Sequence, residues 1–75
     1  MRDEIKKILM ECGIDKKDLE CMDFVKAELM DSLMVADIII AMEDKYHIEI
    51  DGDDIVPGWF TNIGTMECLV KKYVG

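Results

Sequence analysis

A serine that follows an aspartate, in the stretch Asp31-Ser32-Leu33, is the residue of this chain best placed to do chemistry. It stands where an irregular segment gives way to the most strongly apolar helical pattern in the sequence, so its hydroxyl is expected at a helix start. The helix dipole and the free N–H groups there favour anionic phosphate, which suits such a hydroxyl to carrying a phosphodiester. We interpret Ser32 as a covalent attachment point; the plainer alternative is an ordinary first-turn residue.

A self-contained serine hydrolase would need a base and an orienting partner for Ser32. Asp31 is adjacent in sequence, and neighbouring residues of a helix point about 100° apart. His47, the single histidine, lies beyond the far end of the same helix. The sequence therefore predicts no catalytic residue and a protein that is not itself an enzyme.

The helix that follows is predicted over residues 32–46 and has two different faces. The core face has spacings of three, four and seven and consists of Val35, Ile38, Ile39, Met42 and Tyr46. The opposite face alternates aliphatic and acidic side chains, namely Leu33, Asp37, Ile40 and Asp44. An apolar strip beside carboxylates indicates a binding surface. The alternative is a helix buried on most sides, for which so short a chain has little covering protein.

Two further helices are predicted. Residues 3–12 carry an apolar stripe of Ile5, Ile8, Leu9 and Cys12, with Asp3 as the predicted N-cap and Gly13 as the stop. The last helix is expected after a cap at Thr61 or Asn62, with one face formed by Ile63, Met66, Val70, Tyr73 and Val74.

The remaining segments are predicted to be irregular. Residues 14–30 are expected to form a long loop, with room for a short helical turn, held to the core by Leu19, Phe24 and Leu29. Residues 47–50 are interpreted as an extended connector. A turn at 51–54 is expected to cap a short helix around 53–56, which Pro57-Gly58 would end, and Trp59 and Phe60 are expected to anchor the bundle.

Size and charge narrow the range of partners. The 75 residues suffice for one small domain, residues 1–75, which we expect to be a monomer. The formal net charge is −8, from 17 acidic and 9 basic residues. This charge would repel nucleic acids and anionic membranes and attract protein surfaces that are basic.

The cysteines and acidic residues suggest neither a disulfide framework nor a metal site. Cys12, Cys21 and Cys68 form an odd set without a C-x-x-C pair, which favours a reducing, cytoplasmic setting. No signal peptide or membrane span is predicted, because no apolar run reaches about 18 residues. The stretch 51–54 matches a calcium loop poorly, and only weak divalent binding through charge density is expected.

Several motifs together resemble the acyl and peptidyl carrier proteins. They are Asp31-Ser32-Leu33, the helix that ends in 42–46, the connector 48–50 and the stretch 55–63. The resemblance spans essentially the whole chain, with Ile5, Ile8, Leu9 and Phe24 where that family places core residues. It implies an all-α fold, a small four-helix bundle with three longer helices and one short third helix.

The resemblance also implies a function. A phosphopantetheinyl transferase would attach 4′-phosphopantetheine from coenzyme A to Ser32, within Asp31-Ser32-Leu33, and the arm would carry acyl, aminoacyl or peptidyl groups as thioesters. A loading ligase and acyl-processing enzymes would present basic docking patches to the helix that follows. By matching positions, the partner-binding residues would be Leu33, Asp37, Ile40, Glu43 and Asp44.

Two positions depart from the carriers of fatty acid synthesis. Those commonly have glycine where this chain has Leu29 and an acidic residue where it has Met34. The stretch is more similar to free-standing carriers of D-alanyl, polyketide or nonribosomal peptide pathways, although fatty acid synthesis stays open. The alternative from another class is a small acidic helical module that binds proteins or divalent cations without a covalent cofactor.

Overall fold

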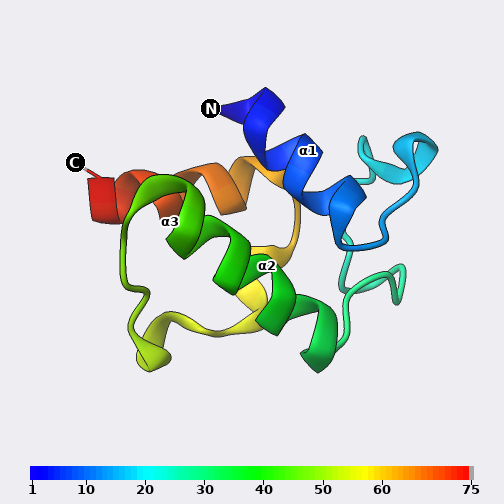
Figure 1. The fold of residues 1–75 in the computed structure, drawn as a ribbon. Coiled ribbons are helices and arrows are strands. Elements are labelled where there is room, and N and C mark those ends of the chain that lie inside the picture. The colour runs from blue at the N-terminus through cyan, green and yellow to red at the C-terminus, as the bar shows by residue number, and fades with distance from the viewer. Residues whose placement is uncertain (75) are drawn as a thin grey trace.

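Residues 1–74, which the computed structural model describes, form three α-helices joined by irregular segments and 3₁₀ turns (Figure 1). The α-helices are α1 (Arg2–Glu11), α2 (Ser32–Tyr46) and α3 (Ile63–Val74). The 3₁₀ turns are η1 (Lys16–Asp18), η2 (Gly52–Asp54) and η3 (Pro57–Phe60). No strand occurs in this part of the chain. The all-helical prediction is confirmed, and the bounds of α2 coincide with those predicted.

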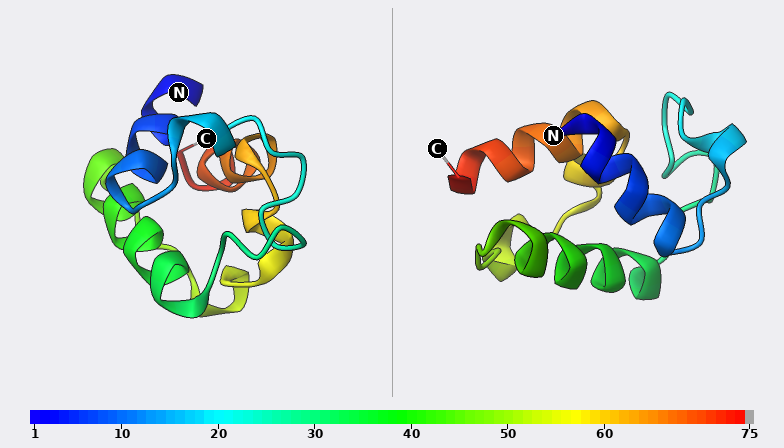
Figure 2. Two further views of the ribbon diagram at one scale, coloured as in Figure 1. Left: turned by 90° about the vertical axis from the view of Figure 1, so that its right-hand side faces the viewer. Right: turned by 45° about the horizontal axis from the view of Figure 1, so that its top comes forward.

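The three α-helices enclose one hydrophobic core. α1 packs against both α2 and α3, and the two views of Figure 2 show it crossing over one side of the pair. Most positions of the apolar face predicted for each helix are buried in this core. The buried helical residues are Ile5, Ile8, Leu9, Ile38, Ile39, Met42, Ile63, Met66, Leu69 and Val70.

The long loop between α1 and α2 is held to the body by side chains and by the backbone. Leu19 and Phe24 are buried, as predicted, while Leu29 is only partly buried. The Phe24 N–H donates a hydrogen bond to the Thr61 carbonyl oxygen at 2.6 Å. The Asn62 side-chain amide donates to the Met22 carbonyl at 3.3 Å. The loop is therefore joined to the start of α3.

The prediction of a short helix around 53–56 is wrong. The 3₁₀ turn η2 ends at Asp54, and Val56 is extended, with φ −129° and ψ 151°. A residue before proline is disfavoured in the helical region, so no helix could run up to Pro57. Proline instead opens η3, because its fixed φ suits a first helical position. Two 3₁₀ turns thus occupy the place of the predicted fourth helix.

Two details at the helix ends also differ from the predictions. Asp3 lies inside the first turn of α1 instead of capping it, since the helix already begins at Arg2 and Met1 is its N-cap. In the C-terminal half of α3, Leu69 is fully buried together with Val70 although the predicted face omitted it, whereas Val74 is exposed.

Capping groups set the other helix ends. Asn62 Oδ1 accepts from the Thr65 N–H at 3.0 Å, and Thr65 Oγ1 accepts from the Asn62 N–H at 3.1 Å, which confirms Asn62 as the cap of α3. Gly13 follows the C-cap of α1 with φ +114°, a conformation that residues with a side chain rarely adopt. Its position as the stop of α1 is confirmed.

None of the helices in residues 1–74 combines the length and the apolar character that a membrane crossing requires.

Candidate functional site

Ser32 is the first residue of α2, and Asp31 is its N-cap. The Asp31 backbone is extended, and its Oδ1 accepts a hydrogen bond from the Met34 N–H at 2.8 Å. The Asp31 carbonyl accepts from the Val35 N–H at 2.9 Å. Both Asp31 and Ser32 are exposed, so the serine hydroxyl is open to solvent at a helix start whose first N–H groups have no intrahelical acceptor. The predicted position of Ser32 at an exposed helix start is therefore confirmed.

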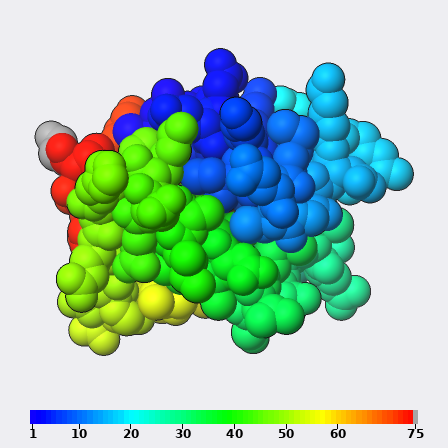
Figure 3. All heavy atoms as spheres, viewed as in Figure 1, coloured from blue at the N-terminus to red at the C-terminus, as the bar shows by residue number. Residues whose placement is uncertain are grey.

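The opposite face of α2 is exposed, as its sequence pattern indicates. Leu33 and Ile40 keep 74% and 63% of their surface accessible, and Asp37 and Asp44 are exposed as well. In the space-filling view the α2 surface lies uncovered in the middle of the visible face, below α1 (Figure 3). Single exposed aliphatic residues are common on proteins, whereas two on one helix face beside carboxylates form an amphipathic strip. The alternative of a helix buried on most sides is wrong.

Glu43, the fifth residue of the predicted partner-binding set, has a structural contact of its own. Its side chain is partly buried, and Oε2 accepts a hydrogen bond from the Ile50 N–H at 2.9 Å. This bond holds the connector 47–50 alongside the last turn of α2. The left-handed conformation of His47, with φ 54°, starts the reversal of the chain there.

Ser32 helps to line an apolar groove between α2 and the segment before α3. Its volume is about 580 Å³. One side is the face of α2, and the opposite side, which we call the wall, is the segment Ile55–Pro57. The buried ring of Phe60 also lines the groove. The other lining residues are Val25, Met30, Asp31, Ser32, Val35, Ala36, Ile39 and Ile40.

The groove is the part of the site that sequence reasoning missed. Ile39 was assigned to the core face of α2 and Ile40 to the opposite face, yet both line the groove. The small Ala36, which lies between the two faces of the helix, was the sequence feature that could have indicated a groove there. Asp31 is the one charged residue of the lining, so a ligand in the groove would meet mainly apolar side chains.

The far end of α2 is tied to α1. The Tyr46 hydroxyl donates to Glu4 Oε1 at 3.2 Å, and Lys45 Nζ lies 3.6 Å from Glu4 Oε2. Burial, and then the bond to the Glu4 carboxylate, raise the pKa of Tyr46 to about 12. These contacts fix the C-terminal end of α2 against α1, while Ser32 at the other end of the helix is exposed.

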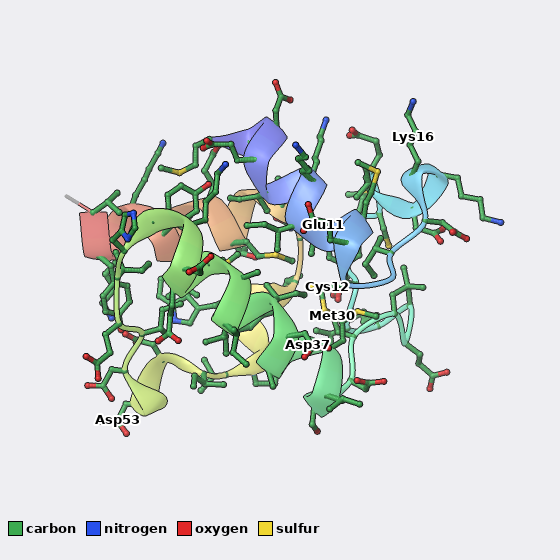
Figure 4. All side chains as sticks on the ribbon, in the orientation of Figure 1. Glu11, Cys12, Lys16, Met30, Asp37 and Asp53 are labelled. Atoms are coloured by element: carbon green, nitrogen blue, oxygen red, sulfur yellow. The ribbon has the colours of Figure 1, made fainter. Side chains whose placement is uncertain are left out.

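Asp37 lies beside the end of α1, close to Cys12 (Figure 4). Burial, and then the negative charges of Asp37 and Glu11, raise the pKa of the Cys12 thiol. A raised pKa keeps the thiol protonated and a poor nucleophile at neutral pH.

His47 cannot act as a base for Ser32 within one chain. The two residues are at opposite ends of the fifteen-residue helix α2. At a rise of 1.5 Å per residue they are about 22 Å apart along the axis. A general base must lie within hydrogen-bond reach of the proton it takes, directly or through one water.

The acidic turn at 51–54 is engaged in protein contacts. Asp51 Oδ1 accepts from the Asp53 N–H at 2.9 Å, and both oxygens of Asp54 accept from Lys72 Nζ at 2.8 Å. Asp53 projects away from the body at the edge of the molecule (Figure 4). Within residues 1–74 no group of three or more His, Cys, Asp or Glu side chains is arranged to hold a metal ion.

Comparison of the chain with protein-family models, with curated proteins and with solved structures finds no significant match. Three features of the chain itself bear on function: Ser32, the exposed face of α2 and the apolar groove.

Proposed function

We propose that this protein is an acyl carrier, whose Ser32 bears 4′-phosphopantetheine as a phosphodiester. The thiol at the end of the arm would hold acyl or aminoacyl intermediates as thioesters. The observation that carries the proposal is the apolar groove of about 580 Å³ that the exposed Ser32 helps to line. A group attached to Ser32 could therefore extend into an apolar site.

The Asp31-capped start of α2 supports the attachment chemistry. The Asp31 side chain satisfies the Met34 N–H and fixes the first turn, so Ser32 is presented in one backbone conformation. The remaining first-turn N–H groups and the helix dipole favour the phosphate that the arm would place there. The protein is a substrate of the phosphopantetheinyl transferase in this proposal and not itself an enzyme.

The exposed face of α2 supports docking of partner enzymes. Leu33 and Ile40 provide apolar contacts, and Asp37 and Asp44 provide charge that attracts basic patches. The partners would be the transferase, a ligase that loads the acyl or aminoacyl group, and acyl-processing enzymes of the cytoplasm. In this proposal η3 is the counterpart of the short third helix of a carrier-type four-helix bundle.

The chemistry of the groove lining indicates what kind of cargo the arm could carry. Its lining is almost wholly apolar, which suits an acyl chain folded back from the arm. D-alanyl, polyketide, nonribosomal peptide and fatty acid pathways all use carriers of this type. The alternative, an acidic module that binds divalent cations, is less favoured because Asp54 is already paired with Lys72 and Tyr73.

Intact-mass measurement tests the proposal. Incubation with coenzyme A and a broad-specificity phosphopantetheinyl transferase should add one phosphopantetheine to the chain, and Ser32→Ala should abolish the addition. Thr61→Val is the matched control, because it removes a hydroxyl elsewhere and should still be modified. An unchanged mass of the parent protein with several transferases would refute the proposal, and so would modification of Ser32→Ala.

A further inference from the structure

Lys72 of α3 touches the chain on both sides of the groove wall. Its Nζ donates to Asp54 Oδ1 and Oδ2, each at 2.8 Å, and Asp54 directly precedes the wall. The same ammonium group lies 5.8 Å from the ring centroid of Trp59, which follows the wall. One side chain therefore holds the two ends of the segment Ile55–Pro57.

Tyr73 reinforces the end at Asp54. Its hydroxyl donates to Asp54 Oδ2 and accepts from the Asp51 N–H at 3.0 Å. Hydrogen bonds from Lys72, and then from Tyr73, lower the pKa of Asp54, while the bond to Asp54 raises the pKa of Lys72. Both groups are thus charged across the neutral pH range, and their attraction persists there.

The two ends of the wall are supported differently. Ile55 and Val56 leave 42% and 44% of their surface exposed, so neither side chain is buried in the core. The backbone hydrogen bonds of this part are local: the Ile55 N–H donates to Gly52 and the Trp59 N–H to Val56. Within residues 1–74, no backbone bond joins the wall to an α-helix. At the Pro57 end, Thr61 Oγ1 donates to the Pro57 carbonyl at 3.4 Å, and Thr65 Oγ1 of α3 donates to the Trp59 carbonyl at 3.0 Å. In the described part of the chain, the Ile55 end has no such bond to α3 except through Asp54, so its distance from α2 depends chiefly on the contacts of Asp54.

We propose that Lys72, gripping Asp54 and Trp59, is a clasp that positions the wall, and that release of the clasp opens the groove beside Ser32. Exposed ion pairs and cation–π contacts are weak, so release lies within reach of thermal motion without unfolding the helices. Only the identity of the natural occupant rests on the proposed function: it would be the apolar part of the group carried on Ser32.

Hydrogen exchange of the unmodified protein tests the clasp. In Lys72→Met, which keeps an apolar stem and loses the charge, the Ile55 and Trp59 amides should exchange about three- to fivefold faster. The α1 amides should exchange at the parent rate. Lys71→Met is the matched control, since Lys71 is the adjacent exposed lysine and pairs with no carboxylate in the described chain. Lys72→Arg should restore most of the protection.

Probe binding tests the link between the clasp and the groove. The neutral apolar dye N-phenyl-1-naphthylamine should enter the groove about three- to fivefold faster in Lys72→Met than in the parent or in Lys71→Met. High salt should speed entry into the parent and leave Lys72→Met unchanged, because only the parent has a charge pair to screen.

The outcomes separate this inference from the proposed function. Equal exchange in the two methionine variants would overturn the clasp, and so would uniform acceleration over all helices, which would assign Lys72 a purely global role. Unchanged dye entry would also overturn it. Because these measurements use protein without phosphopantetheine, and can be repeated with Ser32→Ala, a failure of modification at Ser32 leaves the result for the clasp intact.

Discussion

Replacing Asp31 separates its two contributions to the start of α2. In Asp31→Ala the Met34 N–H loses the acceptor that now lies 2.8 Å away, which should cost about 1 kcal/mol. The lost negative charge at the helix N-terminus should cost a further ~0.3–1 kcal/mol. Because Asp31 is exposed, no burial is lost. The sum, about 1–2 kcal/mol, is a large fraction of the stability of a domain this small.

Asp31→Asn separates the loss of the hydrogen bond from the loss of the charge. Asparagine keeps a side-chain oxygen for the Met34 N–H and removes only the charge, so we expect a loss of ~0.3–1 kcal/mol. For a domain of this size, 1 kcal/mol corresponds to about 4–8 °C in the melting temperature. Urea unfolding followed by far-UV circular dichroism measures both losses at constant m-value.

Asp44→Ala is the control for these variants. It removes an exposed carboxylate from the C-terminal half of the same helix, where a negative charge is unfavourable, and should leave stability unchanged or slightly higher. The reasoning is refuted if Asp31→Ala unfolds at the same urea concentration as Asp44→Ala. It is also refuted if asparagine at 31 destabilises as much as alanine.

Three further predictions concern the supports of α1 and α2. Tyr46 should ionise near pH 12, two units above an ordinary tyrosine, because burial and the Glu4 bond raise its pKa. The stability that its hydroxyl contributes should be complete below pH 10 and lost between pH 10 and 12. Tyrosinate absorbance and the free energy of unfolding, each compared with Tyr46→Phe, measure the two effects. Gly13→Ala, at φ +114°, should lower the free energy of unfolding by about 1–3 kcal/mol in urea. Glu43→Ala leaves the Ile50 N–H without its acceptor and should cost about 1–3 kcal/mol by thermal unfolding, most of it recovered in Glu43→Gln.

Each of these has a clear contrary result. If the absorbance lost in Tyr46→Phe were a component that titrates near pH 10, and not near pH 12, Tyr46 would not have the high pKa. Equal stability of Gly13→Ala and the parent would show that the turn after α1 tolerates a side chain. If Glu43→Gln were no more stable than Glu43→Ala, the bond to Ile50 would not be what Glu43 contributes.

The features that the sequence predicted well depend on short-range chemistry. The bounds of α2 follow from the Asp31 cap and from an apolar period that runs unbroken to Tyr46. The exposure of Leu33 and Ile40 follows from the same period, because a three-helix core has no element left to cover a second face. For this reason the position of Ser32 at the start of α2 could be predicted from the sequence.

The features that it missed depend on contacts between distant parts of the chain. Lys72 and Asp54 are 18 positions apart, and periodicity in α3 says nothing about which turn its end will meet. The groove arises from the path of Ile55–Pro57 relative to α2, which the tertiary fold decides. The false helix at 53–56 is different, since the proline rule that excludes it could be read from the sequence.

The loop before α2 offers a place to modify the molecule. Its tip, residues 26–28, is exposed and closed by its own backbone bonds, from the Ala27 N–H to Asp23 and from the Glu28 N–H to Val25. Glu28 already adopts a left-handed conformation, with φ 58°, that glycine would accept readily. A spectroscopic label or a short inserted sequence at this tip would sit next to Val25, on the rim of the groove, without occupying it.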